Sequence, residues 1–142
     1  MEIRFHHRGV KFTLNHRQEL KAFVPKIFRR EKTACDAIDI IFCTDKFLLE
    51  INKSFLHHNY YTDIITFNLA NPNSPVTGEL YISVDRIKEN AANLSVSFKS
   101  EIHRVIFHGI LHLCGYGDKS QKEQVLIRKM EDLYINEYLS AH

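Results

Sequence analysis

The stretch that most constrains this chain is HGILHLCGYGD, residues 108–118, which ends an apolar segment. His108 and His112 are four residues apart where the spacing is helical, so they project from one face of the predicted helix, about 40° apart around its axis. Two imidazoles arranged in this way can bind one metal ion. Gly115 is typical of a helix end, and the turn after it can bring the carboxylate of Asp118 back beside the two rings.

These three side chains predict a catalytic metal site rather than a structural one. A Zn²⁺ ion held by two histidines and one carboxylate keeps a fourth position for water, whereas a structural zinc has four protein ligands. Two histidines at this spacing also occur by chance in a chain with nine of them, but a buried polar pair is costly without a ligand, which favours the metal. Zinc proteases have a Glu base directly after the first histidine. Gly109 stands there, which disfavours a peptidase.

The same stretch resembles the signature of the YbeY family, metal-dependent endoribonucleases of ribosomal RNA maturation, which reads HGxLHLxGYDH. The matching positions are His108, Gly109, Leu111, His112, Leu113, Gly115 and Tyr116. Gly117 stands where the family has Asp, and Asp118 where it usually has a third His ligand. The resemblance implies that His108, His112 and Asp118 bind one divalent ion, with Zn²⁺ the expected metal and an altered ligand charge.

A second stretch resembles the family segment LNxxYRxKDxPTDVLSF. The matching residues are Asn52, Thr62, Asp63 and Phe67. The family arginine, which the resemblance implies helps to hold RNA, falls on Leu56, and the Lys-Asp pair falls on His58 and Asn59. Leu56 cannot bind a phosphate, so this role needs another residue.

Arg104 is the candidate substitute, because it precedes His108 by four residues and lies near the same face of the helix. Its guanidinium would hold a scissile phosphate by a bidentate contact. An ion pair with Glu101 that only anchors the helix explains the position equally well, and the sequence leaves both open. Asp118 has a second potential role as general base, which the metal itself or the substrate could also fill.

Other polar and sulfur-containing residues near the motif carry weaker signals. His57, His58, Tyr60 and Tyr61 form a cluster suited to unstacked RNA bases, although a tyrosine-rich turn packed on the core is the more common explanation. Cys114 points away from the histidine face and is expected to pack. His103 is about 140° from His108 around the helix, so it is not expected to join the ion.

Composition sets the broad class. With 142 residues, 44% hydrophobic and 25% charged, the chain is expected to form a single domain over residues 1–142. No apolar run approaches the ~20 residues of a membrane span, and the first residues lack the apolar core of a signal peptide. Three cysteines without CxxC spacing do not suggest a disulfide scaffold, which favours a cytoplasmic location. The net charge of +2 permits an RNA partner without proving one.

Hydrophobic periodicity predicts strands at residues 2–7, 35–43, 64–68 and 79–84, and helices at 16–30, 45–55, 85–94, 98–114 and 122–139. Asn15 with Gln18 predicts a capping box for the first helix, and Thr44 an N-cap for the second. This order predicts an α/β (α+β) fold in which a four-stranded mixed sheet packs with about five helices. The family resemblance implies a mostly parallel sheet, one antiparallel edge strand and a central metal helix.

The favoured function is a metal-dependent endoribonuclease of single-stranded RNA. The resemblance implies action on ribosomal RNA, at the 3′ end of 16S RNA in the small subunit, and in ribosome quality control. The alternative is a ribosome-assembly RNA-binding factor in which the metal is structural and the basic helix at residues 17–30 binds RNA. Whether water or the ribose 2′-OH attacks the phosphate stays open.

Overall fold

The computed structural model describes residues 1–58 and 62–142. The strands are β1 (Glu2–Arg8), β2 (Cys35–Cys43), β3 (Ile64–Asn68) and β4 (Val76–Ser83), and the helices are α1 (Arg17–Arg30), α2 (Asp45–Leu56), α3 (Val84–Leu94), α4 (Phe98–Leu113) and α5 (Gln121–Ala141). Every predicted element is present. The fourth strand starts three residues earlier than predicted, at Val76, because its first residues pair with β2.

The helix caps confirm one prediction and correct another. The Thr44 side chain accepts a hydrogen bond from the Phe47 backbone N–H, as an N-cap should. The predicted capping box at Asn15 is wrong, because α1 begins after His16, which adopts a left-handed conformation and makes no side-chain cap. Chain direction at this turn therefore depends on the backbone of His16 and not on a polar side chain.

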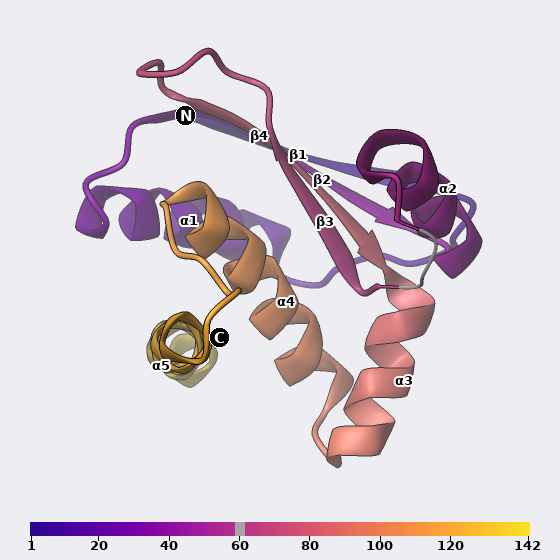
Figure 1. The fold of residues 1–142 in the computed structure, drawn as a ribbon. Helices are drawn as coiled ribbons and strands as arrows, with labels where there is room; N and C mark the ends of the chain where they lie inside the picture. The colour runs from indigo at the N-terminus through magenta and orange to yellow at the C-terminus, as the bar shows by residue number, and fades with distance from the viewer. Residues whose placement is uncertain (59–61) are drawn as a thin grey trace.

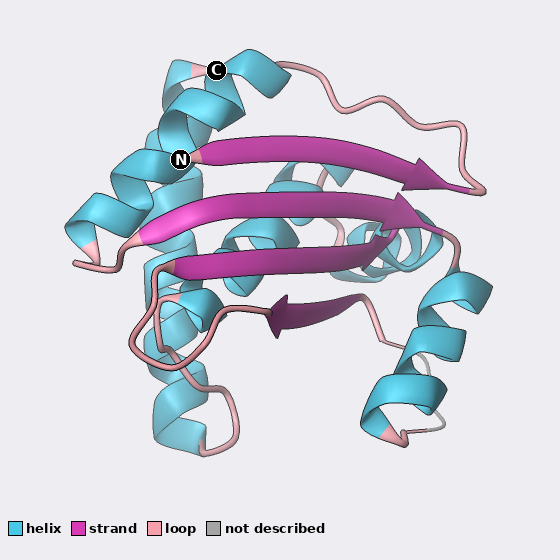
Figure 2. Ribbon diagram, turned by 90° about the horizontal axis from the view of Figure 1, so that it is seen from above, coloured by secondary structure: helices cyan, strands magenta, loops and turns pink. Residues whose placement is uncertain are grey.

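The sheet has the order β1-β2-β4-β3 (Figure 2). Strands β1, β2 and β4 are parallel, and β3 pairs antiparallel with β4 at one edge. This confirms the expected mixed sheet with one antiparallel edge strand. The chain leaves β3 through residues 69–75 and returns as β4, and this hairpin places β3 beside the site described below.

Helices cover both faces of the sheet (Figure 1). One face packs on α1, α4 and α5 through the main core, which includes Ile38, Ile40, Phe42, Leu80 and Ile82 from the strands. The other face carries α2 over a smaller cluster of Cys43, Leu48, Ile51 and Ile65. Alternate residues of the strands thus enter different cores, as the two-residue repeat of a strand requires.

Two glycines let α4 approach the sheet more closely than any side chain would allow. A Cβ atom on Gly109 would lie 2.8 Å from both Ile64 Cδ1 and Leu80 Cδ2. A Cβ atom on Gly78 of β4 would lie 2.6 Å from Leu113 Cδ1. The C-terminal half of α4, with its two motif histidines, is consequently held tightly against β3 and β4. None of the helices in the described part of the chain is both long and apolar enough to cross a bilayer.

Candidate metal centre

Three predicted ligand atoms converge at the C-terminal end of α4. The Nε2 atoms of His108 and His112 are 2.9 Å apart, and Asp118 Oδ2 lies 3.2 Å from His112 Nε2 and 3.5 Å from His108 Nε2. Within the described residues these side chains form a group that can hold a metal ion. The structure therefore brings together the three side chains that the sequence predicts as ligands.

The spacing fits a tetrahedral ion. Ligand atoms at about 2.0–2.1 Å from a tetrahedral Zn²⁺ lie roughly 3.3–3.4 Å from one another, and the three observed separations of 2.9, 3.2 and 3.5 Å bracket that value. Two imidazole nitrogens 2.9 Å apart repel each other through their lone pairs unless a proton or a cation lies between them. Among the described residues the donor set thus supplies three ligands to a divalent ion, which leaves the fourth tetrahedral position free.

The opposite nitrogen of each ring is already engaged. His108 Nδ1 donates to Glu131 Oε2 at 2.6 Å, and His112 Nδ1 donates to the Tyr116 carbonyl at 2.7 Å. With protons on both Nδ1 atoms, both Nε2 atoms present lone pairs to the centre, which is the usual arrangement of metal-binding histidines. Burial lowers the pKa of His108, but the hydrogen bond and charge of Glu131, with the charges of Asp118 and Asp63, outweigh burial and raise it.

The turn after α4 places Asp118. Gly115 has φ of 103°, a conformation that glycine adopts without strain, and its backbone N–H donates to the His112 carbonyl. The Gln124 side chain donates to the Asp118 carbonyl at 2.9 Å, and α5 begins at a capping box between Ser120 and Glu123. The turn is fixed at both ends, so the carboxylate returns to the histidine face as predicted.

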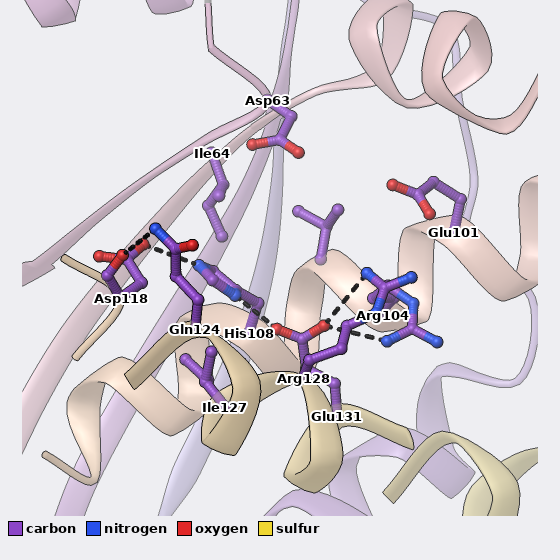
Figure 3. Close-up of a pocket in the computed structure, with 11 residues that line it drawn as sticks. Asp63, Ile64, Glu101, Arg104, His108, Asp118, Gln124, Ile127, Arg128 and Glu131 are labelled. Carbon is purple, nitrogen blue, oxygen red and sulfur yellow. Dashed lines mark hydrogen bonds and ion pairs between the residues drawn. The ribbon is translucent and has the colours of Figure 1, made fainter. Parts of the chain in front are cut away.

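Two cavities meet at the trio. One, of about 340 Å³, runs along α4 and α5 (Figure 3), and the other, of about 720 Å³, runs along β3. Asp63, Ile64, His108 and Asp118 line both cavities. A substrate in either cavity would therefore reach the ligand atoms.

Arg104 lines the smaller cavity but does not pair with Glu101. Its Nη1 donates to Glu131 Oε1 at 3.0 Å and its Nη2 to Asp132 Oδ1 at 2.6 Å, both on α5. The predicted alternative of an Arg104–Glu101 ion pair is wrong, because α5 crosses α4 at this point and supplies two closer carboxylates. Arg104 does anchor its helix, through different partners.

Two further carboxyl groups face the smaller cavity (Figure 3). Glu101 is 5% exposed, and burial together with the charge of Asp63 raises its pKa. Burial also raises the pKa of Asp63, which accepts a hydrogen bond from Asn90 at 3.3 Å. The wall opposite α5 thus carries two carboxyl groups that are harder to ionise than usual, and helical spacing did not predict that Glu101 would lie there without an Arg104 ion pair.

The comparisons with known proteins agree with this geometry. The family model for endoribonuclease YbeY matches residues 3–139. The chain belongs to the YbeY family. Endoribonuclease YbeY of Cytophaga hutchinsonii is 41% identical over 134 residues, 94% of each chain. That of Porphyromonas gingivalis is 40% identical over 131 residues, 92% of this chain and 86% of its own. The solution structure of TM1509 from Thermotoga maritima gives a TM-score of 0.64 at 25% identity, over 98% of this chain and 90% of that one.

Three of the departures from the YbeY signature, at Leu56, His58 and Asp118, line the larger cavity, whereas Gly117 lines a separate one. Leu56, which replaces the family arginine, lines this cavity together with His58. Tyr60 and Tyr61 of the predicted aromatic cluster, and Asn59, lie outside the described residues. Asp118 takes the place of the third histidine and reaches the other two ligands.

Two other residues near the motif, His103 and Cys114, are not members of the ligand group. His103 lies outside the ligand group, as expected. Cys114 is a free cysteine that packs against the core, and burial raises the pKa of its thiol to about 12. It is not a member of the ligand group, which agrees with a packing role.

Glu131, which contacts both His108 and Arg104, was not predicted from the sequence. The sequence does contain a feature from which a buried contact of Glu131 could have been predicted. Glu131 occurs on the apolar face of α5, in line with Ile127, Tyr134 and Tyr138, which are all buried. An acidic residue on the buried face of an amphipathic helix is rarely left without a partner, so its position alone predicts a polar contact inside the protein.

Proposed function

We propose that this chain is a metal-dependent endoribonuclease of single-stranded RNA, that Zn²⁺ is its metal, and that residues 1–142 form one catalytic domain. The proposed substrate is ribosomal RNA of the small subunit, at the 3′ end of 16S RNA, with a role in ribosome quality control in the cytoplasm. Membership of the YbeY endoribonuclease family supports the reaction class. The convergence of two imidazole nitrogens and one carboxylate oxygen with a position to spare carries the proposal.

The bound ion and Asp118 have different proposed roles. A divalent ion bound there would activate water at neutral pH and offset the charge on a phosphate oxygen. Asp118, whose side chain is 45% exposed, is the most accessible of the three ligands. It is also the carboxylate that we propose as general base, because Gly109 leaves no acidic side chain directly after His108.

Arg104 is the proposed phosphate-binding residue. A guanidinium has five N–H donors, and the hydrogen bonds to Glu131 and Asp132 use two of them. The carboxylates fix the plane of the group, while the cavity that Arg104 lines extends to His108 and Asp118. A phosphate placed between Arg104 and the ligand trio would lie beside the guanidinium on one side and, once the trio held a divalent ion, beside that ion on the other.

Metal removal tests the proposal. Purified protein is analysed for bound metal, stripped with a chelator, and assayed for cleavage of a single-stranded ribosomal RNA fragment before and after Zn²⁺ is restored. We expect the stripped protein to keep its circular dichroism spectrum, lose cleavage and regain it with Zn²⁺. If the stripped protein unfolds, the metal is structural and the alternative of a ribosome-assembly binding factor is favoured. Cleavage that persists after complete removal contradicts metal dependence.

A further inference from the structure

Glu131 uses its two carboxylate oxygens for two different partners. Oε2 accepts from His108 Nδ1 at 2.6 Å, and Oε1 accepts from Arg104 Nη1 at 3.0 Å (Figure 3). The residue is 3% exposed. Arg128, one turn earlier on α5, approaches Oε1 only to 3.8 Å and is 58% exposed, so Arg104 is the main cation beside this carboxylate.

A carboxylate at this depth needs both contacts. Burying an ionised carboxylate costs several kcal/mol unless it is paired and hydrogen-bonded. Arg104 supplies the opposite charge, and the His108 N–H supplies the second donor. In return, the carboxylate can accept but cannot donate, so it keeps the proton of His108 on Nδ1 and the lone pair of Nε2 directed at the ligand trio.

We propose that Glu131 is a positioning residue of the metal centre: it fixes the tautomer and orientation of His108 and links that ring to Arg104. The inference rests on the proposed metal site but does not depend on RNA being the substrate. His112 receives equivalent support from a backbone carbonyl, that of Tyr116, which no substitution of the Tyr116 side chain removes. Glu131 is therefore the ligand support that mutation can test.

The neighbouring residue provides a matched control. Asp132 also accepts from Arg104, at 2.6 Å from Nη2, but it is 52% exposed and, among the described residues, forms an ion pair with Arg104 and not with His108. Asp132→Asn removes one carboxylate charge from the same arginine and leaves the His108 contact intact. Glu131→Gln removes the charge while keeping an acceptor for His108, and Glu131→Leu removes both.

Co²⁺ and Zn²⁺ affinities, measured by competition with a chromogenic chelator, test the inference. Loss of a hydrogen-bond partner behind a metal-bound histidine typically costs about 10–100-fold in affinity. We expect a loss in this range for Glu131→Leu, a smaller loss for Glu131→Gln, and unaltered affinity for Asp132→Asn. The Co²⁺ absorption spectrum, which reports coordination geometry, should change with Glu131→Leu only.

A second measurement separates positioning from general stability. At alkaline pH, where the ring is neutral, imidazole ¹⁵N shifts of metal-free protein should show His108 with its proton on Nδ1. They should show a mixture of tautomers in Glu131→Leu or, if that variant does not fold, in Glu131→Gln, whose amide can donate as well as accept. Affinity and tautomer unchanged in a folded Glu131 variant would overturn the inference while leaving the metal site standing. Failure of the unaltered protein to bind either ion would instead overturn the metal site, and this role with it.

Discussion

Two of the three histidines on helix α4, His103 and His108, have opposite surroundings. His103 is 2% exposed, packs against the rings of Phe107 and Tyr138, and has a buried Nε2 with no hydrogen-bond partner among the described residues. Burial lowers its pKa. His108 is also largely buried, but its Nδ1 donates to a carboxylate and its pKa is raised.

The contrast shows that partners decide what a histidine in this helix can do. Five residues turn the helix by about 140°, which is enough to move a side chain from an aromatic core to the edge of a cavity. On the core face, His103 Nδ1 makes a single backbone contact, with the Lys99 carbonyl at 2.6 Å. On the cavity face, Glu131 and Asp118 surround His108 with negative charge, which suits a cation.

Replacing either ligand histidine should have the largest effect on RNA cleavage. His108→Ala and His112→Ala each remove one of three ligands, and loss of the ion removes several kcal/mol of charge stabilisation. We expect cleavage of single-stranded RNA to fall by at least about 10³-fold, with an unchanged circular dichroism spectrum. Single-turnover assays, with enzyme in excess over RNA and with added metal ion, measure the loss.

The matched control lies on the same helix. His103→Phe replaces a buried ring by a ring, does not touch the ligand trio, and should leave both metal affinity and cleavage close to those of the unaltered protein. If His103→Phe lost as much cleavage as His108→Ala, the two faces would not be functionally distinct. Persistent cleavage in both ligand variants would rule out a catalytic ion at this position.

Arg104→Ala should have the next largest effect. A hydrogen bond to a charged group contributes about 1.5–3 kcal/mol, so loss of a phosphate contact should reduce cleavage by roughly 10- to 100-fold. The variant should also melt at a lower temperature, because Glu131 loses its main cation. Arg104→Lys keeps a charge beside α5 but not the planar fork, and should recover stability more than cleavage. A lower melting temperature with unchanged cleavage would remove the catalytic role and leave the anchoring one.

Gly109→Ala changes the contact between α4 and the sheet without touching either histidine. The added Cβ would lie 2.8 Å from Ile64 Cδ1 and from Leu80 Cδ2. Overpacking of this kind costs about 1–3 kcal/mol, partly offset by the ~1 kcal/mol that alanine gains over glycine in a helix. We expect a net loss of up to about 2 kcal/mol in the free energy of unfolding, measured in urea. A more stable variant would mean that the Ile64 and Leu80 side chains move aside without a loss of stability.

Much of this arrangement follows from local sequence. The bounds of β2 and β3 and the start of α4 agree with prediction, because runs of β-branched and apolar residues end there at clear turn or cap residues. The ligand trio also follows from local rules, since His108, His112 and Asp118 lie within one helix end and its turn. The spacing of four residues and the glycine after the helix are sufficient to bring them together.

What depends on the crossing of α4 and α5 could not be predicted. Helical spacing assigned Arg104 a partner on its own helix, Glu101, but the rule for neighbours three or four residues apart takes no account of a second helix. The actual partners are 27 and 28 residues away. Glu131 reaches His108 across the same crossing, 23 residues away. Amphipathic periodicity predicts that α5 packs by one face, but not which helix it meets or at what register.

The smallest expected effect concerns pH and the core-facing histidine. The pKa of His103 in the folded protein is lowered from an ordinary value of 6.5, by burial first and also by the charges of Lys99 and His16. Below about pH 6.5 the unfolded chain therefore takes up a proton that the folded chain does not, and stability falls as the pH falls. His103→Phe cannot take up this proton, so its stability relative to the unaltered protein should increase as the pH falls from 7.5 to 5.5. Urea unfolding of both proteins in chelator cancels the contributions of the other histidines, and a difference that does not vary with pH would mean that His103 is protonated equally well in the folded core.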